Sequence, residues 1–237
     1  MKTRFALFLV VLILAAQLVG LFCVSAARER ERANNPTFRL ECASYDPRDL
    51  LRGHYLPLDF KILRDVPASK LDAAARERLR EKHADEINRL GEEREASLMM
   101  NLDGFWLVLA PNAGTGFWEV ERATFDDPKI DFNAHPENGR AALRLKWSGA
   151  LWLRFRRPED APAPKTFDDV FDPAFGMTMH SYDFELPNRR FYLSEKKAKR
   201  FDAEARGNAA RVVSAELFLR DDGAPVLKRL FVDGEEF

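Results

Sequence analysis

The stretch GFWLVLAPNAGTGFWEVERATF, residues 104–125, indicates the fold class of this chain most directly. Two runs of aromatic and branched apolar residues flank a segment rich in proline, asparagine and glycine, residues 111–116. Such runs are typical of β-strands, and the residues between them are typical of turns. The stretch therefore predicts an antiparallel hairpin.

Strand patterns continue on both sides of this hairpin. Residues 37–42 alternate apolar with charged side chains, which predicts a half-buried strand. Residues 141–155 predict a second hairpin with a Ser-Gly turn, and residues 210–234 predict a third with an Asp-Gly turn. Residues 182–193 add one or two strands, which brings the expected number to about eight.

Two segments have helical patterns. Residues 68–97 are predicted to form a long amphipathic helix, whose apolar residues recur at spacings of three and four or their sums: Leu71, Ala75, Leu79, Ile87 and Leu90. Ser194 and Gly207 are typical start and stop signals for a second, short helix. We therefore predict an α+β fold, a mainly antiparallel β-rich domain with two helices.

The N-terminus carries a segment long enough to cross a membrane. Phe5–Ala27 contains 23 residues without a charge, and a bilayer core needs about 20 helical residues. Lys2 and Arg4 precede it, so the positive-inside rule favours a cytoplasmic N-terminus, although the arginines within residues 28–32 weaken that bias. The sequence predicts a single-pass anchor that contacts lipid through residues 5–27.

A cleaved signal peptide is the alternative, because Val24–Ala26 is a passable cleavage site. The apolar run exceeds the roughly 7 to 15 residues usual in that class, which favours the anchor. The predicted organisation is an anchor or uncleaved signal at 1–27, a charged juxtamembrane linker at 28–36, and a folded domain at 37–237 with a helical insertion at 68–97.

Composition excludes several functions. The formal net charge is −1, and nucleic-acid binding calls for a basic excess, so we expect no nucleic-acid partner. Cys23 lies in the apolar segment and cannot pair with Cys42. The four histidines are scattered, without ligand spacing: His54, His83, His135 and His180. His83 lies near the apolar stripe of the long helix and is expected to pack there. We predict no metal and no cofactor.

The stretch DPRDLLRGHYLPLDF, residues 46–60, concentrates charges, a glycine and aromatics. Its first half predicts a helical turn, with Asp46 as N-cap, Pro47 at the first helical position, Asp49 interacting favourably with the helix dipole and Gly53 ending the turn. The chain then extends.

In that extended part, Leu58 and Phe60 share one strand face. Pro57 has no N–H for a ladder, which predicts an edge strand or a bulge. Neither the turn nor the strand requires the side chains found at their junction, which are Arg52, His54 and Tyr55. These three residues are our first candidates for a binding surface.

GHYLPLDF, residues 53–60, resembles the motif of the GDYXXLXY proteins, in which Gly-Asp-Tyr is followed by two free positions, Leu, one free position and Tyr. His54 replaces the Asp and Phe60 the last Tyr. Residues 191–206 and 217–234 are similar to the C-terminal part of that family. The resemblance implies a membrane-anchored bacterial protein of unknown biochemical function, some relatives being encoded with multi-pass membrane proteins.

From this resemblance we expect the bacterial inner (cytoplasmic) membrane, a periplasmic domain and a multi-pass partner. Tyr192 and Glu195 lie at a strand-to-helix junction and are the further candidates for the binding surface, although Glu195 also simply favours a helix N-terminus. Neighbouring side chains of a strand point to opposite faces, so the two rings of each aromatic doublet, at 105–106 and 117–118, cannot face the same side. Some aromatic surface is therefore expected to be covered by the long helix or to meet a partner or the membrane interface. The sequence does not indicate an oligomeric state.

An enzyme is the alternative function. Ser44 and residues 47–53 weakly resemble the segment that carries the nucleophile in membrane-bound Ser–Lys peptidases. Such a dyad needs a desolvated lysine, and the candidates lie in charged settings: Lys61, Lys70, Lys129 and Lys146. A binding or accessory module is therefore the preferred interpretation.

Overall fold

The computed structural model describes residues 2–42, 55–64, 66–92, 95–101, 105–145, 150–156, 163–173, 178–180, 190–192, 196–197 and 212–236. The chain divides into two compact units, Met1–Asn35 and Pro36–Phe237. The first holds one long helix, and the second holds all the strands and the shorter helices that the structure describes. The predicted α+β class with antiparallel strands is confirmed within these residues, whose two α-helices are the N-terminal one and one helix of the folded unit.

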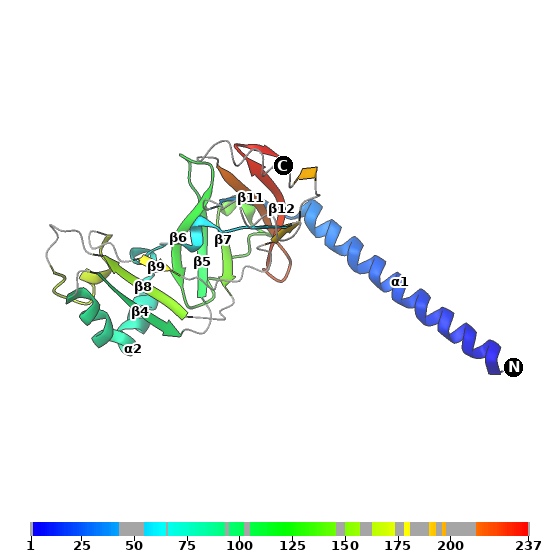
Figure 1. Ribbon diagram of the computed structural model, residues 1–237, viewed down its shortest axis with the longest axis horizontal. Helices are drawn as coiled ribbons and strands as arrows, with labels where there is room; N and C mark the ends of the chain where they lie inside the picture. Colours follow the sequence, from blue (N-terminus) through cyan, green and yellow to red (C-terminus); the bar gives the residue numbers. More distant parts are fainter. Residues whose placement is uncertain are drawn as a thin grey trace. The chain divides into compact units, whose positions relative to one another are not determined.

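The first unit is helix α1, Lys2–Asn34 (Figure 1). Its 33 residues include a stretch, Leu9–Asn34, that is long and apolar enough to cross a membrane, as a signal sequence would also be. Large apolar side chains are exposed along it, Leu18 by 68% and Phe22 by 73%. The charged residues 28–34, expected as a linker, continue the helix.

The β11 sheet contains both ends of the folded unit. Its strands, in spatial order, are β1 Thr37–Glu41, β11 Val213–Leu219, β12 Pro225–Val232 and β13 Glu235–Glu236, all antiparallel. In β1 burial alternates as predicted, with Phe38 and Leu40 inside. The predicted β11–β12 hairpin is confirmed, and Gly223 at its turn adopts a φ of 77° that favours glycine.

The β5 sheet is built on the hairpin predicted from residues 104–125. Its antiparallel order is β6 Trp118–Thr124, β5 Phe105–Pro111 and β7 Ala141–Leu145. At the turn, the Asn112 carboxamide oxygen accepts a hydrogen bond from the Gly114 N–H at 2.8 Å. Asparagine at this place closes the turn locally, which is why the pattern was readable from sequence.

The β8 sheet corrects one prediction. Its order is β3 Val66–Pro67, β9 Thr178–His180, β8 Ala150–Arg156 and β4 Glu95–Asn101. The hairpin predicted over 141–155 is wrong, because β7 pairs with β5 whereas β8 pairs with β4 at seven positions. Alternating patterns mark strands but do not name partners, and here both strands pair with strands from the 95–111 region.

A two-stranded sheet joins β2, Tyr55–Pro57, to β10, Arg190–Tyr192. Pro57 thus lies in a strand with one partner among the described residues, in agreement with the predicted edge position. The predicted helical turn at 46–53 lies outside the described residues. So does the second predicted helix, apart from Lys196 and Lys197, which are helical.

Helix α2 spans Ala73–Glu92 and is shorter than predicted at both ends. At the start, residues 68–70 form a 3-10 turn and Leu71 is extended. At the end, residues 95–97 belong to β4, because pairing along the whole of β8 outweighs their helical propensity. His83 has non-helical dihedrals and kinks the helix, with its side chain half-buried.

The apolar stripe of this region is buried as predicted at Leu71, Ala75, Leu79 and Ile87. Helix α2 contacts β4 (Figure 1) and β6. The remaining helical elements are single 3-10 turns: η2 Lys61–Leu63, η3 Ala68–Lys70, η4 Pro136–Asn138 and η5 Asp169–Phe171.

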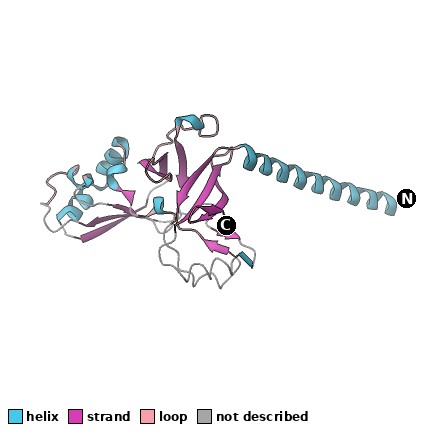
Figure 2. Ribbon diagram, turned by 90° about the horizontal axis from the view of Figure 1, so that it is seen from above, coloured by secondary structure: helices cyan, strands magenta, loops and turns pink. Residues whose placement is uncertain are grey.

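Strands are the main regular elements in the described part of the folded unit (Figure 2), and aromatic rings join two of its sheets. Phe38 of β1 lies 5.7 Å from Trp118 of β6, between ring centroids, and both rings pack against Phe132 at 5.8 and 5.4 Å. Edge-on aromatic pairs at these distances add about 0.5–1.5 kcal/mol beyond their burial. This triad fixes β1 against β6.

Asp72 caps the N-terminus of α2. The Asp72 carboxylate accepts the Ala75 N–H at 2.8 Å, and the Asp72 N–H donates to the Ala123 carbonyl of β6 at 3.0 Å. Asp72→Ala should lower the free energy of unfolding by about 0.5–2 kcal/mol, because the first turn loses its acceptor. Urea denaturation of the full chain in detergent micelles measures this.

Asp72→Asn is the matched control, since it keeps an oxygen acceptor and should retain most of the stability. Equal losses in the alanine and asparagine variants would contradict the capping role.

Candidate functional site

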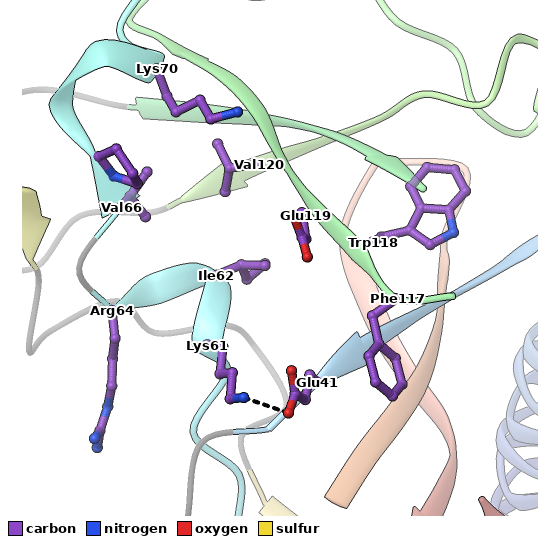
Figure 3. Close-up of a pocket in the computed structure, with 11 residues that line it drawn as sticks. Glu41, Lys61, Ile62, Arg64, Val66, Lys70, Phe117, Trp118, Glu119 and Val120 are labelled. Carbon is purple, nitrogen blue, oxygen red and sulfur yellow. Dashed lines mark hydrogen bonds and ion pairs between the residues drawn. The ribbon is translucent and has the colours of Figure 1, made fainter. Parts of the chain in front are cut away.

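A pocket of about 270 Å³ lies where the end of β1, the segment 61–70 and the start of β6 meet (Figure 3). Its wall combines charged and apolar side chains: Glu41, Lys61, Ile62, Arg64, Val66, Pro67, Lys70, Phe117, Trp118, Glu119 and Val120. All of these residues belong to the folded unit. The arrangement suits a ligand with both an apolar part and a charged group.

The GHYLPLDF stretch leads directly into this pocket. Leu58 and Phe60 are both buried, exposed by 4% and 1%, and Phe60 forms a β-bridge with Cys42 at the end of β1. The Leu63 N–H then donates to the Phe60 carbonyl at 3.0 Å, which starts the η2 turn. Burial of the motif's last residue therefore places Lys61 and Arg64 at the pocket rim.

Ion pairs orient the charged rim. Lys61 Nζ lies 2.5 Å from Glu41 Oε1, and Arg64 pairs with Asp59 of the motif (Figure 3 shows the first pair). The Lys61 side chain is 56% exposed, so water screens the pair and its stabilising effect is small. These pairs fix side-chain directions more than they hold the fold.

Lys70 differs from the other two cations. Among the described residues its ammonium has no hydrogen-bonding or ion-pair partner, and its side chain is exposed. Figure 3 shows it extending from η3 toward β6. Glu119, by contrast, accepts a hydrogen bond from the Asn112 amide at 2.9 Å. Lys70 is therefore the cation most available to a ligand.

A second hollow, of about 570 Å³, lies near the end of β6 and contains Glu121, Lys129 and Arg140. Arg140 donates to both carboxylate oxygens of Glu121 at 2.6 Å, and this hydrogen bonding lowers the pKa of Glu121. Lys129 pairs with Asp127 at 3.1 Å. Among the described residues of its lining Ile130 is the one apolar residue, so this hollow offers little apolar surface to a ligand and is the weaker candidate.

The predicted surface residues are only partly described. The backbones of Tyr55 and Tyr192 are direct cross-strand partners in the β2–β10 pair, so the two segments singled out from sequence lie side by side. Arg52, His54 and Glu195 lie outside the described residues, as do the predicted turn residues Asp46, Pro47, Asp49 and Gly53. Their shared binding surface stays a prediction.

The expected aromatic docking surface is not seen among the described side chains. Phe105 is buried, whereas Trp106, Phe117 and Trp118 are half-buried. Beyond Asn35, the large apolar side chain that is exposed in the described part of the folded unit is Val212, at 41%. Trp118 packs against Phe38 of another sheet, and Phe117 and Trp118 line the pocket, which is the apolar feature open to a ligand.

Other chemistry finds little support in the described residues. They contain no group of three or more histidine, cysteine or acidic side chains that could hold a metal. Of the lysines considered for a Ser–Lys dyad, Lys61, Lys70 and Lys129 are exposed, whereas Ser44 and Lys146 lie outside the described residues. The dyad needs a lysine shielded from water, and these three side chains are exposed, so none of them meets that requirement.

Sequence reasoning did not assign the pocket. It treated Lys61 and Lys70 only as bases of a peptidase, and Glu41 as an ordinary strand residue. A usable signal was present, since Lys61 follows the last motif residue directly and Lys70 lies only nine residues further on. The link from this segment to β6 depends on tertiary packing and had no local signature.

The buried thiol of Cys42 makes the stability of the folded unit depend on pH. Burial raises the pKa of its thiol from 9.0 to about 12, with smaller contributions from Asp59 and Glu41. The unfolded thiol loses its proton near pH 9 while the folded thiol keeps its proton to about pH 12. The unfolded state therefore binds fewer protons between these values, and this group's contribution to stability is complete below pH 9 and declines above it.

Between pH 9 and 11 the free energy of unfolding should fall less in the Cys42→Ala variant than in the wild type. Urea denaturation of the full chain in micelles at each pH measures this. Cys23→Ala is the control, because Cys23 is exposed on α1 and the change should leave the profile unaltered. Identical pH profiles for wild type and Cys42→Ala would contradict the assignment.

Comparison with known proteins agrees with the sequence resemblance. The family model of the GDYXXLXY protein matches residues 17–230, which cover the apolar helix in part, the motif, the pocket segment and the closing hairpin. Neither the curated proteins nor the solved structures give a match. Because the matched region is most of the chain, this protein belongs to the GDYXXLXY protein family.

Proposed function

We propose that this protein is a membrane-anchored binding or accessory module whose folded unit lies outside the cytoplasm and docks onto a membrane protein partner. The observation that carries the proposal is α1, a long apolar helix with exposed side chains in a unit separate from the folded one. A helix with this surface needs lipid or another protein around it.

The length of α1 supports an anchor. A helix of 33 residues is about 50 Å long at 1.5 Å per residue, whereas the hydrocarbon core is about 30 Å thick. The charged turns at 28–34 can thus continue into the interface without a break. Lys2 and Arg4 favour a cytoplasmic N-terminus, and this supports a periplasmic folded unit.

The pocket supports binding over catalysis. It offers oriented ion pairs, one available lysine and apolar wall residues. The one thiol of the described folded unit, Cys42, is buried with a raised pKa and is therefore no nucleophile. The peptidase alternative gains no support from the exposed lysines described above.

The third prediction concerns the anchor. Membranes from cells that express the full chain should retain it after a carbonate wash, and its intact mass should remain 27.2 kDa. A reporter fused after Phe237 should be active only outside the cytoplasm. A soluble form that begins near residues 25–27 would identify a cleaved signal, and a reporter active only in the cytoplasm would reverse the orientation.

The fourth prediction concerns the partner. Chemical cross-linking of intact membranes should convert the full chain into adducts heavier than 27.2 kDa, in which mass spectrometry finds a multi-pass membrane protein. A chain with Phe5–Ala27 replaced by an unrelated apolar helix is the control, because docking through the folded unit should survive this exchange. Recovery of the monomer alone would remove support for docking.

A further inference from the structure

The start of strand β6 is an open edge among the described residues. In the β5 sheet β6 is the end strand, and it pairs with β5 along its length. On its other side, a bridge from Leu71 to Ala123 occupies only the far end. Residues 117–120, which line the pocket, lie before that bridge. An edge of this kind can accept another extended segment.

The size of the pocket favours a peptide side chain over a whole small molecule. Its volume of about 270 Å³ falls below the roughly 300–1,000 Å³ typical of small-molecule sites. Ile62, Val66 and Val120 line its apolar part (Figure 3). A single aliphatic side chain, presented by an extended backbone beside β6, would fill much of this space.

The charges of the rim select an acidic segment. Three cations, Lys61, Arg64 and Lys70, face two acids, Glu41 and Glu119. Both acids already have hydrogen-bonding or ion-pair partners within the chain, whereas Lys70 makes no hydrogen bond or ion pair among the described residues and interacts with Glu121 only through its charge. An acidic side chain that approaches along β6 would meet this unpaired ammonium, and a basic one would be repelled.

We infer that an extended, acidic segment of the protein partner adds to β6 at Trp118–Val120, with an aliphatic side chain against Ile62 and Val120 and a carboxylate on Lys70. This inference rests on the proposed docking function and names its contact surface. The backbone ladder supplies affinity, and the pocket and Lys70 supply selection.

A defined peptide tests the inference. The probe is a fluorescein-labelled peptide of nine residues, alternating valine and threonine around a central leucine, with aspartate at both ends. It is titrated into the full chain in detergent micelles and followed by fluorescence anisotropy. The acidic peptide should bind at least about tenfold more tightly than the same peptide with lysine at both ends.

A third peptide carries proline at alternate positions and cannot form a ladder, so it should not bind. Binding of the proline peptide as tight as that of the acidic one would overturn strand addition. Absence of binding by the acidic peptide would overturn the inference as well.

Variants of the chain locate the contact. Lys70→Glu should weaken binding of the acidic peptide by about tenfold. Lys82→Glu is the matched control, because Lys82 is an exposed lysine on α2 away from the pocket residues, and it should leave binding unchanged. Equal weakening by both would show general charge attraction and overturn the assignment. Lys70→Ala, a milder change, covers the case in which Lys70→Glu does not fold.

Site-specific photo-cross-linking in intact membranes separates this inference from the proposed function. A photoreactive residue in place of Glu119 should capture an acidic, aliphatic segment of a membrane protein. Capture of a partner from other positions of the folded unit, but not from 119, would overturn the inference and leave docking intact. Capture of lipid or of this chain itself at 119 would also overturn it, and no capture from any position would remove both.

Discussion

The folded unit depends on the burial of Phe60 beneath the end of β1. Its bridge to Cys42 joins the family's motif to β1, the strand that follows the apolar helix α1 in sequence. Because Phe60 is 1% exposed and Cys42 6%, the chain has little freedom when it turns into η2. The position of Lys61 and Arg64, and with it one wall of the pocket, follows from this single packing constraint.

The opposite wall depends on the aromatic triad of Phe38, Trp118 and Phe132. Phe38 belongs to β1 and Trp118 to β6, so the triad sets the spacing between two sheets that share no strand. The pocket lies where these two constraints meet. A cavity between independently fixed walls keeps its shape without a ligand, and such preorganisation lowers the cost of binding.

Sequence predicted those features whose causes are local. The β5–β6 hairpin and the β11–β12 hairpin each carry their turn residues between their strands, and both were found. The partner of β8 was missed because the choice between β7 and β4 is made by packing over long separations. For the same reason the helix predicted from sequence includes residues 95–97. Their composition suits a helix, but in the structure they pair with β8 as part of β4. At the candidate site, Tyr55 and Tyr192 are cross-strand partners, but the binding surface expected from the sequence stays a prediction. The role of β6 as the far wall of the pocket had no local signal.

The energetics of the pocket suit a reversible contact. Exposed ion pairs such as Lys61–Glu41 contribute little stability, about 0–1 kcal/mol, so their exchange for a partner's charges costs little. Apolar burial in a small pocket and a short ladder then decide affinity. In the anchored form that we propose, this chain and its partner would be confined to one membrane surface, and confinement raises their effective concentration. A weak, charge-selected contact would then be sufficient for the docking that we propose, even though the described part of the folded unit exposes few large apolar side chains.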